Sequence, residues 1–480
     1  MNLRAEILST SDRERIHRES LRILGEVGVR IHSQKALRLL HQSGARIDWD
    51  AKIARIPAEL VELALQTAPQ SFMLGARNPT YAFPLPAPFS GYCLDGTGTF
   101  AVDFHSGEKR YGTRKDIENA LRVFQHTDMG VMAWAPVCAS DTPAGSRALH
   151  EFITMMKFCS KHGQHELHRA DQVPYLVAAL KAILGSEAEI RSKKNYSLIY
   201  CPVAPLTHEG EMLDAYLELG EFAMPVMIMP MPVSGTTGPA HLFSNLCLAN
   251  AETLSALVIF QLAHPGRPLI YSNAVGSVDF RNGSFLAGTP ETALHSAAMV
   301  EMGRFYNLPS TSAGCSTDAK QPGAEAVLEK FQTALPSVLA GSDIIVGFGE
   351  IESDQTLILE QIVVDNEIAH LCKRLSEGID TSQENYLFED IAQVGPGGNF
   401  LKCKSTRQAA RSAEFYLPRL LDRNPYEVWL AQGKPNMYTH ARQIVADILA
   451  APITDPLPQS VTEELDEILQ KADRELEQSP

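Results

Sequence analysis

Short apolar runs alternate along most of the chain with longer segments of helical spacing. The apolar runs, each predicted to form a strand, are residues 131–136, 164–168, 197–202, 226–233, 269–274, 310–315, 344–348 and 391–394. The helical segments, in which apolar residues recur every three or four positions, are residues 147–160, 173–184, 211–222, 240–262, 290–306, 324–339 and 356–375. Strands that are apolar on both faces and separated by helices are typical of a parallel sheet.

Eight such strand–helix repeats, joined by right-handed crossovers, predict an α/β fold that closes into a (β/α)8 TIM barrel. The alternative is an open, doubly wound sheet. That fold predicts a glycine-rich phosphate turn after the first strand, and the sequence has none there.

The remaining segments predict a cap before the barrel and a helical extension after it. We expect an N-terminal helical and β cap over residues 1–125, the barrel over 126–404 and a C-terminal helical extension over 405–480. The cap contains a turn-rich β stretch at 90–111. We expect the last helical segment, 462–477, to pack on a second subunit or to be solvated, and the protein to be a homo-oligomer.

Composition excludes several classes of partner. The apolar fraction is 45%, and the formal charge is −15, from 57 acidic against 42 basic residues, so no nucleic-acid or anionic-lipid footprint is visible. The start of the chain shows no targeting signal, and the most apolar run, 223–233, is short and contains three prolines. We therefore expect a cytoplasmic location and no membrane span.

Side chains that follow the strands are the first candidates for an active site, because barrel sites form at the carboxyl ends of the strands. These candidates are Trp134, His165, Glu166, His168, Tyr200, Cys201, Met229, Tyr271, Ser272, Asn273, Cys315, Thr317, Asp318, Phe348 and Glu350. Aromatic rings with one or two carboxylates suit a methylated ammonium ion, whose diffuse charge donates no hydrogen bond. The competing interpretation is that each of these rings belongs to the core.

Metal and acyl-transfer chemistry are not indicated. Strand alternation would point His165 and His168 to opposite faces, and the letters HELH are not the HExxH motif, so we predict no tightly bound metal. The eight cysteines are widely spaced without a CxxC motif, and no GxSxG motif occurs. Chemistry that depends on positioning and desolvation fits better.

Several stretches together resemble the trimethylamine methyltransferase family. They are LDGTGTFAV at 94–102, the segment MPVSGTTGPAH…GRPLIYS at 231–272, GTPETALHSAAMVEMGRFYNLPSTSAGCSTDAK at 288–320, VVDNEI at 363–368, GPGGNFL at 395–401 and YLPRLLDRNPYEVW at 416–429. The resemblance implies a (β/α)8 barrel whose open face receives a separate corrinoid (cobalamin-type) protein. It also implies the reaction, in which a methyl group passes from an amine to Co(I).

The resemblance also narrows the methyl donor. Archetypal trimethylamine enzymes of this family carry pyrrolysine shortly after the TDAK-like motif, and residues 321–329 here are all standard. The chain is therefore similar to the non-pyrrolysine branch, which demethylates quaternary amines such as glycine betaine. It departs from the family at Asn399, at Ser405 and Thr406, and at 158–162. These departures leave carnitine, proline betaine, γ-butyrobetaine or a sulfonium open as donors.

We predict that the protein is a quaternary-amine:corrinoid methyltransferase with a desolvated pocket. The predicted substrate-binding residues are Trp134, Tyr200, Tyr271 and Phe348 as an aromatic cage, Asp318 or Glu350 as the anionic partner, and Lys320 or Asn273 for a substrate carboxylate. Two alternatives remain. The methyl group could pass to tetrahydrofolate or a thiol without cobalamin, or the protein could bind a betaine without turnover.

Overall fold

Eight parallel strands form the centre of the molecule in the computed structural model, which describes residues 3–476. In chain order they are β6 (Gly91–Leu94), β9 (Gly130–Trp134), β10 (His162–His165), β11 (Tyr196–Tyr200), β13 (Val226–Ile228), β14 (Leu269–Tyr271), β17 (Thr311–Ala313) and β18 (Ile344–Phe348). A bridge between Tyr271 and Ser310 joins the two ends of this sheet. Hydrogen bonds from Tyr271 N to Pro309 O and from Ala313 N to Asn273 O, both 2.9 Å, flank the bridge. The predicted (β/α)8 barrel is thereby confirmed.

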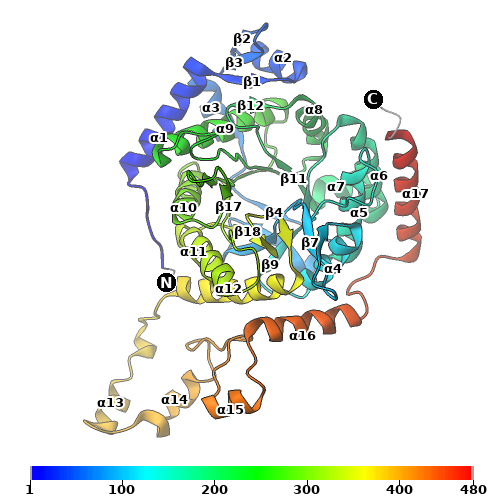
Figure 1. The fold of residues 1–480 in the computed structure, drawn as a ribbon. Helices are drawn as coiled ribbons and strands as arrows, with labels where there is room; N and C mark the ends of the chain where they lie inside the picture. Colours follow the sequence, from blue (N-terminus) through cyan, green and yellow to red (C-terminus); the bar gives the residue numbers. More distant parts are fainter. Residues whose placement is uncertain (1–2, 477–480) are drawn as a thin grey trace.

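A ring of helices surrounds the barrel, as Figure 1 shows in a view along its axis. These helices are α4 (Arg114–Gln125), α5 (Arg147–Phe158), α6 (Val173–Leu184), α7 (Glu187–Lys193), α8 (Gly210–Leu219), α9 (Leu242–Ala263), α10 (Pro290–Phe305), α11 (Ala324–Ala340) and α12 (Leu359–Glu377). The strands are buried on both faces because side chains fill the barrel interior on one side and contact the helices on the other.

One of the predicted strands is wrong, and a different segment takes its place. Residues 391–394 lie in the short helix α13 (Phe388–Val394), in which Ile391 is 52% exposed. The strand that completes the barrel is instead β6, the first of the eight in chain order. It lies within the stretch that we expected to belong to the cap, and its four residues are all buried. The barrel therefore begins at Gly91 rather than after residue 125. Its last helix, α12, ends at Glu377.

The N-terminal cap packs on α9 and makes that helix a core element. It consists of α1 (Thr10–Arg22), α2 (Gln34–Gln42), α3 (Ala58–Thr67) and a small sheet of β1 (Val29–Ile31), β2 (Arg46–Asp48), β3 (Ile53–Arg55) and β12 (Thr207–His208). Among the described residues α9 is the one helix long and apolar enough to cross a bilayer. However, 89% of its most apolar 18-residue stretch is buried inside the protein. Its burial on all sides is explained by contacts with the barrel on one side and with α1 and α3 on the other.

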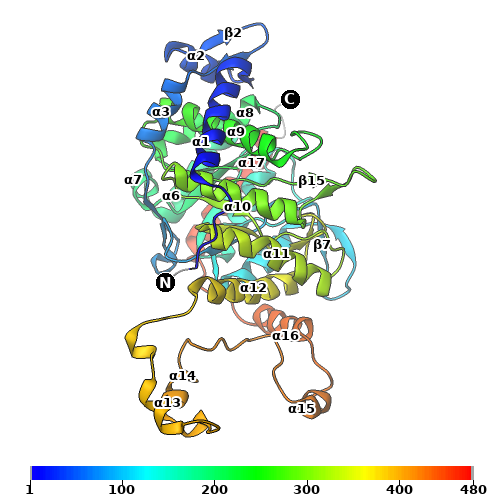
Figure 2. The same cartoon turned by 90° about the vertical axis from the view of Figure 1, so that its left-hand side faces the viewer.

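Short strands form a rim at the carboxyl ends of the barrel strands. A four-stranded sheet combines β7 (Phe100–Val102), β8 (Lys109–Tyr111), β19 (Glu350–Ile351) and β20 (Thr356–Leu357), and a hairpin pairs β15 (Ser277–Val278) with β16 (Phe285–Leu286). Figure 2 shows β7 and β15 on the same end of the barrel. A third small pair, β4 (Phe72–Leu74) with β5 (Phe83–Leu85), lies earlier in the chain.

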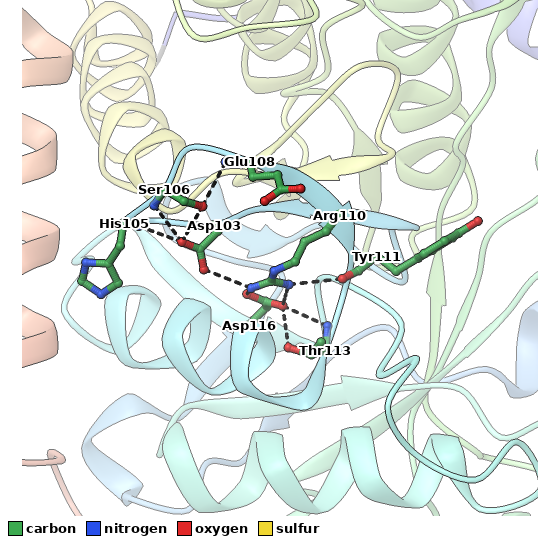
Figure 3. A network of polar contacts seen from close by, with 8 residues as sticks. All are labelled: Asp103, His105, Ser106, Glu108, Arg110, Tyr111, Thr113 and Asp116. Atoms are coloured by element: carbon green, nitrogen blue, oxygen red, sulfur yellow. Dashed lines mark hydrogen bonds and ion pairs between the residues drawn. The ribbon is translucent and has the colours of Figure 1, made fainter.

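The β7–β8 hairpin is fixed to the start of α4 by the contacts drawn in Figure 3. Arg110 donates to both carboxylate oxygens of Asp116, at 2.6 and 3.0 Å, and to Asp103 at 3.3 Å. Asp116 also accepts from the backbone and hydroxyl of Thr113, which closes a capping box at the helix N-terminus. A bidentate pair of this kind gives the rim a defined position.

The helices after α12 divide into a detached part and a part that packs on the barrel. They are α13, α14 (Lys404–Ala409), α15 (Tyr426–Ala431), α16 (Met437–Ala450) and α17 (Gln459–Leu476). Helix α16 packs on α12 and α4, and α17 packs on α6 and α5, where Asp473 accepts from His150 Nε2 at 2.8 Å. The last helix therefore has a partner in its own chain, contrary to our expectation of a second subunit or solvent.

Candidate active site

A cavity of about 330 Å³ lies at the carboxyl end of the barrel, and every barrel strand or the loop after it contributes to its wall. The strand-derived lining residues are Asp95, Gly96, Thr97, Trp134, Glu166, His168, Ile199, Cys201, Met229, Met231, Ala274, Val275, Ala313, Ser316 and Val346. Phe285, Ser353 and Asp354 add to the wall from the rim. The cavity occupies the position at which barrel enzymes place their catalytic groups.

The two halves of this cavity differ in chemistry. The strands β10, β9 and β6 contribute Glu166, Trp134 and Asp95, whereas β11, β13 and β14 contribute mainly methionine and aliphatic side chains, such as Met229. Among the residues that the structure describes, no lysine or arginine lines the cavity. Carboxylates and an aromatic face on one side, with an apolar wall opposite, suit an organic cation whose surface is mostly alkyl.

Trp134 and Glu166 are held by a chain of buried polar contacts. The indole N–H of Trp134 donates to Glu166 Oε2 at 3.0 Å, and that oxygen lies 3.3 Å from His165 Nδ1. His165 Nε2 lies 3.0 Å from Glu151 Oε2, and Glu151 also accepts from the backbone N–H of Ala139 at 2.7 Å. Burial lowers the pKa of His165, but the carboxylates of Glu166 and Glu151 outweigh it and the pKa lies above its ordinary value. His165 therefore hydrogen-bonds Glu151 and lies within ion-pair distance of Glu166.

Gly96 gives Trp134 its second support. A Cβ at position 96 would lie 2.0 Å from Trp134 Cε2, so only a glycine leaves room for the ring to lie on this backbone. Gly98 is similar, because a Cβ there would lie 2.6 Å from Glu350 Oε1. The two glycines of the LDGTGT segment are thus explained by the close approach of the backbone to the side chains of Trp134 and Glu350.

Three carboxyl groups cluster on the β6 and β18 side of the cavity. Asp95 and Asp354 line it, and Glu350 is fully buried, with neither carboxylate oxygen hydrogen-bonded among the described residues. Burial raises the pKa of Asp95, and burial together with the charge of Asp95 raises the pKa of Asp354 well above its ordinary value. Burial, together with the charges of Asp95 and Asp354, also raises the pKa of Glu350 well above its ordinary value. Protonated members of this cluster can donate hydrogen bonds, and ionised members favour a cation.

Lys330 supplies the nearby counter-charge from outside the cavity. Its buried Nζ donates to Asp365 Oδ2 at 2.9 Å and to the carbonyl oxygens of Cys315 and Gly347 at 2.8 and 2.7 Å. Gly347 lies in β18 and Cys315 follows β17, so the Lys330–Asp365 pair joins two neighbouring strands. The Lys330 ammonium therefore stabilises the barrel and does not face the cavity.

The predicted aromatic cage is only partly present. Trp134 lines the cavity, but the rings of the other three candidates point toward the helices. Tyr200 donates to His208 Nδ1 at 2.8 Å, Tyr271 donates to Asn250 Oδ1 at 2.7 Å, and Phe348 packs on Tyr92 with ring centroids 4.8 Å apart. For Tyr200 the reason is strand alternation, since its neighbours Ile199 and Cys201 line the cavity. For Phe348 the reason is a register shift in β18, which separates it from the lining residue Val346. The observed wall contains Trp134, Phe285 and methionines instead.

The predicted polar residues also have other neighbours than we expected. Asp318 accepts from the backbone N–H groups of Ala287 and Gly288, at 2.7 and 3.1 Å, and so holds the loop before α10. Lys320 is exposed and donates to the backbone carbonyl of Asp318. Neither lines the cavity.

Asn273 and Glu350 remain candidates. Asn273 is buried beside the lining residue Ala274, and neither its amide nitrogen nor its amide oxygen has a hydrogen-bond partner among the described residues. Glu350 lies behind Gly98, next to the Asp95–Asp354 pair. Both roles stay predictions.

Sequence reasoning missed Asp95, Gly96 and Asp354. The signal for the first two was present, because LDGTGT follows the apolar letters GYC and would mark a strand end once that strand is recognised. Asp354 lies in the turn between β19 and β20, and no local pattern indicates that this turn reaches the cavity. His168 and Glu166, which the sequence did indicate, both line the cavity.

The fold and the site define a TIM-barrel protein with a small, acidic and partly aromatic cavity at the carboxyl ends of its strands. Comparison with known proteins identifies the family. The model of the trimethylamine methyltransferase (MTTB) family matches residues 2–477, and the chain belongs to this family of methyltransferases.

Several relatives are similar over nearly their whole length. The chain is 31% identical to the trimethylamine methyltransferase MttB of Methanosarcina barkeri, covering 98% of this chain and 95% of that one. It is 29% identical to the glycine betaine methyltransferase of Desulfitobacterium hafniense (strain Y51), covering 94% of each. The crystal structure of the Methanosarcina barkeri monomethylamine methyltransferase (MtmB) aligns with a TM-score of 0.49 and 12% identity, over 98% of this chain and 88% of that chain.

Proposed function

We propose that the protein transfers a methyl group from a quaternary amine, glycine betaine or a related compound, to the Co(I) of a separate corrinoid protein. The observation that carries this proposal is the cavity itself, in which Trp134 and the carboxyl groups of Glu166 and Asp95 face an apolar wall. The similarity to a glycine betaine methyltransferase supports the quaternary donor.

Binding would depend on matching a diffuse positive charge. The face of Trp134 would contact the methyl groups of the ammonium, which is worth about 0.5–2 kcal/mol per ring. Glu166, held by Trp134 and His165, would supply a fixed negative charge beside the same ligand. The methionines opposite would exclude water, which strengthens both interactions in the closed cavity.

In this reaction the cavity residues need only hold the substrate in position and exclude water. The reduced corrinoid supplies the nucleophile that accepts the methyl group. The C–N bond breaks with its electron pair on nitrogen, so the quaternary ammonium leaves as a neutral tertiary amine and no proton is needed. A cavity that holds the methyl group in line and keeps water out favours this step over hydrolysis or exchange.

The substrate's other end would meet a different set of groups. A betaine carboxylate finds no lysine or arginine among the described lining residues. It can accept from a protonated member of the Asp95–Asp354 pair, from Asn273, or from His168, which is exposed at the mouth. This arrangement favours donors whose carboxylate is short or absent over those that need a fixed cation.

The size of the cavity decides how a corrinoid would fit. About 330 Å³ accommodates a small amine but is far smaller than a corrinoid macrocycle. Residues 3–476 contain no group of three or more His, Cys, Asp or Glu side chains arranged to hold a metal ion. A corrinoid would therefore approach the substrate from the open mouth, where Met231 and His168 lie at the exposed edge.

The test is a methyl-transfer assay with free cob(I)alamin and a panel of quaternary amines, tertiary amines and sulfoniums. We expect methylcobalamin and stoichiometric demethylated amine from at least one quaternary amine. Trp134→Leu should lower kcat/KM about tenfold or more, since it removes the aromatic face. The matched variant Trp49→Leu changes a half-exposed tryptophan of the cap and should retain activity.

Two results would contradict the proposal. Methyl transfer to tetrahydrofolate or a thiol in a cobalamin-free mixture would select a different acceptor. Tight calorimetric binding of a betaine with no demethylated product after long incubation would select a binding protein without turnover.

A further inference from the structure

A segment between α12 and α15 projects from the barrel and is exposed along its length, with Glu414 O accepting from Arg374 of α12 at 3.0 Å near its end. We define this arm as residues 379–415, which include α13 and α14; none of them is buried. Figures 1 and 2 show it extending away from the helices of the barrel in both views. After the arm, the chain contacts the barrel again at two residues. The Tyr416 hydroxyl donates to Glu367 Oε1 at 2.7 Å, and Arg419 forms an ion pair with Asp128 at 2.8 Å. The arm is thus anchored at both ends.

Large apolar side chains are exposed along the whole arm. Their exposed fractions lie between 44% and 77%, and they are Ile379, Tyr386, Leu387, Phe388, Ile391, Phe400, Leu401 and Phe415. Eight such residues in one short segment greatly exceed the scattered apolar residues of an ordinary surface. Covering them would contribute about 25 cal/mol for each Å² of apolar surface removed from water.

The charges of the arm are divided between its two halves. Residues 379–400 contain four acids, Asp380, Glu384, Glu389 and Asp390, and no lysine or arginine. Residues 401–415 contain four bases, Lys402, Lys404, Arg407 and Arg411, and one acid, Glu414, at their end. Within the described part of the chain, none of the four acids of the first half and none of the four bases of the second half forms an ion pair. Each half therefore lacks a charged complement among residues 3–476.

We propose that the arm is the contact surface between two copies of this chain, paired antiparallel about a two-fold axis. A two-fold axis brings the same surface of both copies together, so the acidic half of each arm faces the basic half of the other. The apolar side chains, which lie among the charged residues of both halves, then cover those of the other arm. A partner of uniform charge would complement only one half and would repel the other.

The pairing is tested with two charge-reversal variants of the full chain, examined by sedimentation equilibrium. One is Glu384→Lys with Glu389→Lys, and the other is Lys402→Glu with Arg407→Glu. All four side chains are exposed. Each variant alone places like charges in both zones of the pair, so we expect its association to weaken by about 100-fold. An equimolar mixture of the two should restore pairing, because each reversed half then meets an opposite charge.

A matched control carries the same number of Glu→Lys changes elsewhere. Glu464→Lys with Glu467→Lys lies on the exposed side of α17 and should associate as the unmodified chain does. Far-ultraviolet circular dichroism and the melting temperature check that all variants are folded. The proposal is overturned if the unmodified chain is monomeric, if both arm variants associate normally, or if their mixture fails to recover pairing. In the monomeric case, loss of corrinoid-protein binding in the arm variants would assign the arm to that partner instead.

Discussion

The backbone of Gly96 lies directly against the indole ring of Trp134. A Cβ on Gly96 would approach Trp134 Cε2 to 2.0 Å and Cδ2 to 2.2 Å. The ring is held in its own plane by the hydrogen bond from its N–H to Glu166 at 3.0 Å. The aromatic wall of the cavity is therefore positioned by a glycine that follows β6 and a carboxylate that follows β10.

Gly96→Ala should displace Trp134 and weaken ligand binding. The added methyl group cannot be accommodated without moving the ring or β6, which costs about 1–3 kcal/mol of folding stability. Loss of the aromatic face should raise the dissociation constant for a quaternary amine about tenfold or more. Calorimetry and urea denaturation measure the two effects. Gly323→Ala is the control, because a Cβ there meets nothing within 4 Å, and unchanged binding by Gly96→Ala would contradict the inferred contact.

Glu166→Gln should weaken cation binding while leaving Trp134 in place. The amide oxygen of glutamine can still accept from the Trp134 N–H, but the negative charge is lost. Hydrogen bonds and contacts to a charged group contribute about 1.5–3 kcal/mol, which corresponds to a rise in KM of about 10- to 150-fold. Glu464→Gln, on the exposed surface of α17, provides the matched control. Tryptophan fluorescence checks that the ring has not moved, and an unchanged KM would exclude Glu166 from the site.

His165→Gln should destabilise the protein most at low pH. The pKa of His165 is raised in the folded state, so its stabilising contribution is complete below its ordinary value of 6.5. That contribution is lost as pH rises through the raised folded-state pKa. Urea denaturation of both proteins across this range should therefore show a difference in unfolding free energy that shrinks as pH increases.

His162→Gln is the matched contrast on the same strand and should show the opposite trend. Burial lowers the pKa of His162 to about 4, so its contribution is present above 6.5 and is lost as pH falls toward 4. Parallel trends for the two variants would argue against a protonated His165 between Glu151 and Glu166.

Asp354→Asn should become more stable relative to the unmodified protein as pH rises. The folded-state pKa of Asp354 is raised, so ionising it costs stability above its ordinary value of 3.8, and asparagine removes this cost. Cation binding by the variant should also depend less on pH. Asp103→Asn is the control, because hydrogen bonds from Ser106 lower the pKa of Asp103 to about 2. Its destabilisation should therefore persist at neutral pH and vanish as pH falls toward 2.

One barrel strand was missed and one was wrongly predicted, because the local sequence pattern does not show which segments pair in the sheet. Seven of the eight barrel strands overlap predicted runs, and most of these are apolar because a strand buried on both faces is apolar at successive positions. Strand β10 is the exception, since it has the polar letters HGQH and is nevertheless buried. Strand β6 has only the letters GYCL and begins at a glycine. Residues 391–394 are similar in letters but stay exposed in α13, because no neighbouring strand pairs with them.

The site residues divide in the same way. The sequence placed Trp134 and Glu166 at strand ends, and both line the cavity. It could not decide that Tyr200 and Tyr271 face the helices, because the phase of alternation depends on how each strand pairs and where it leaves the sheet. Asp354 reaches the cavity only through the fold of a distant turn.

The sequence by itself determined the barrel, the family resemblance and the ends of the strands at which ligands bind, since these follow from periodicity and short local motifs. Only the tertiary structure decided which side chains line the cavity, that Asp95 and Asp354 share it, and that none of residues 379–415 is buried. The physical reason is that burial, and with it the pKa of each carboxyl group and the exposure of each apolar side chain, depends on neighbours that are remote in the chain.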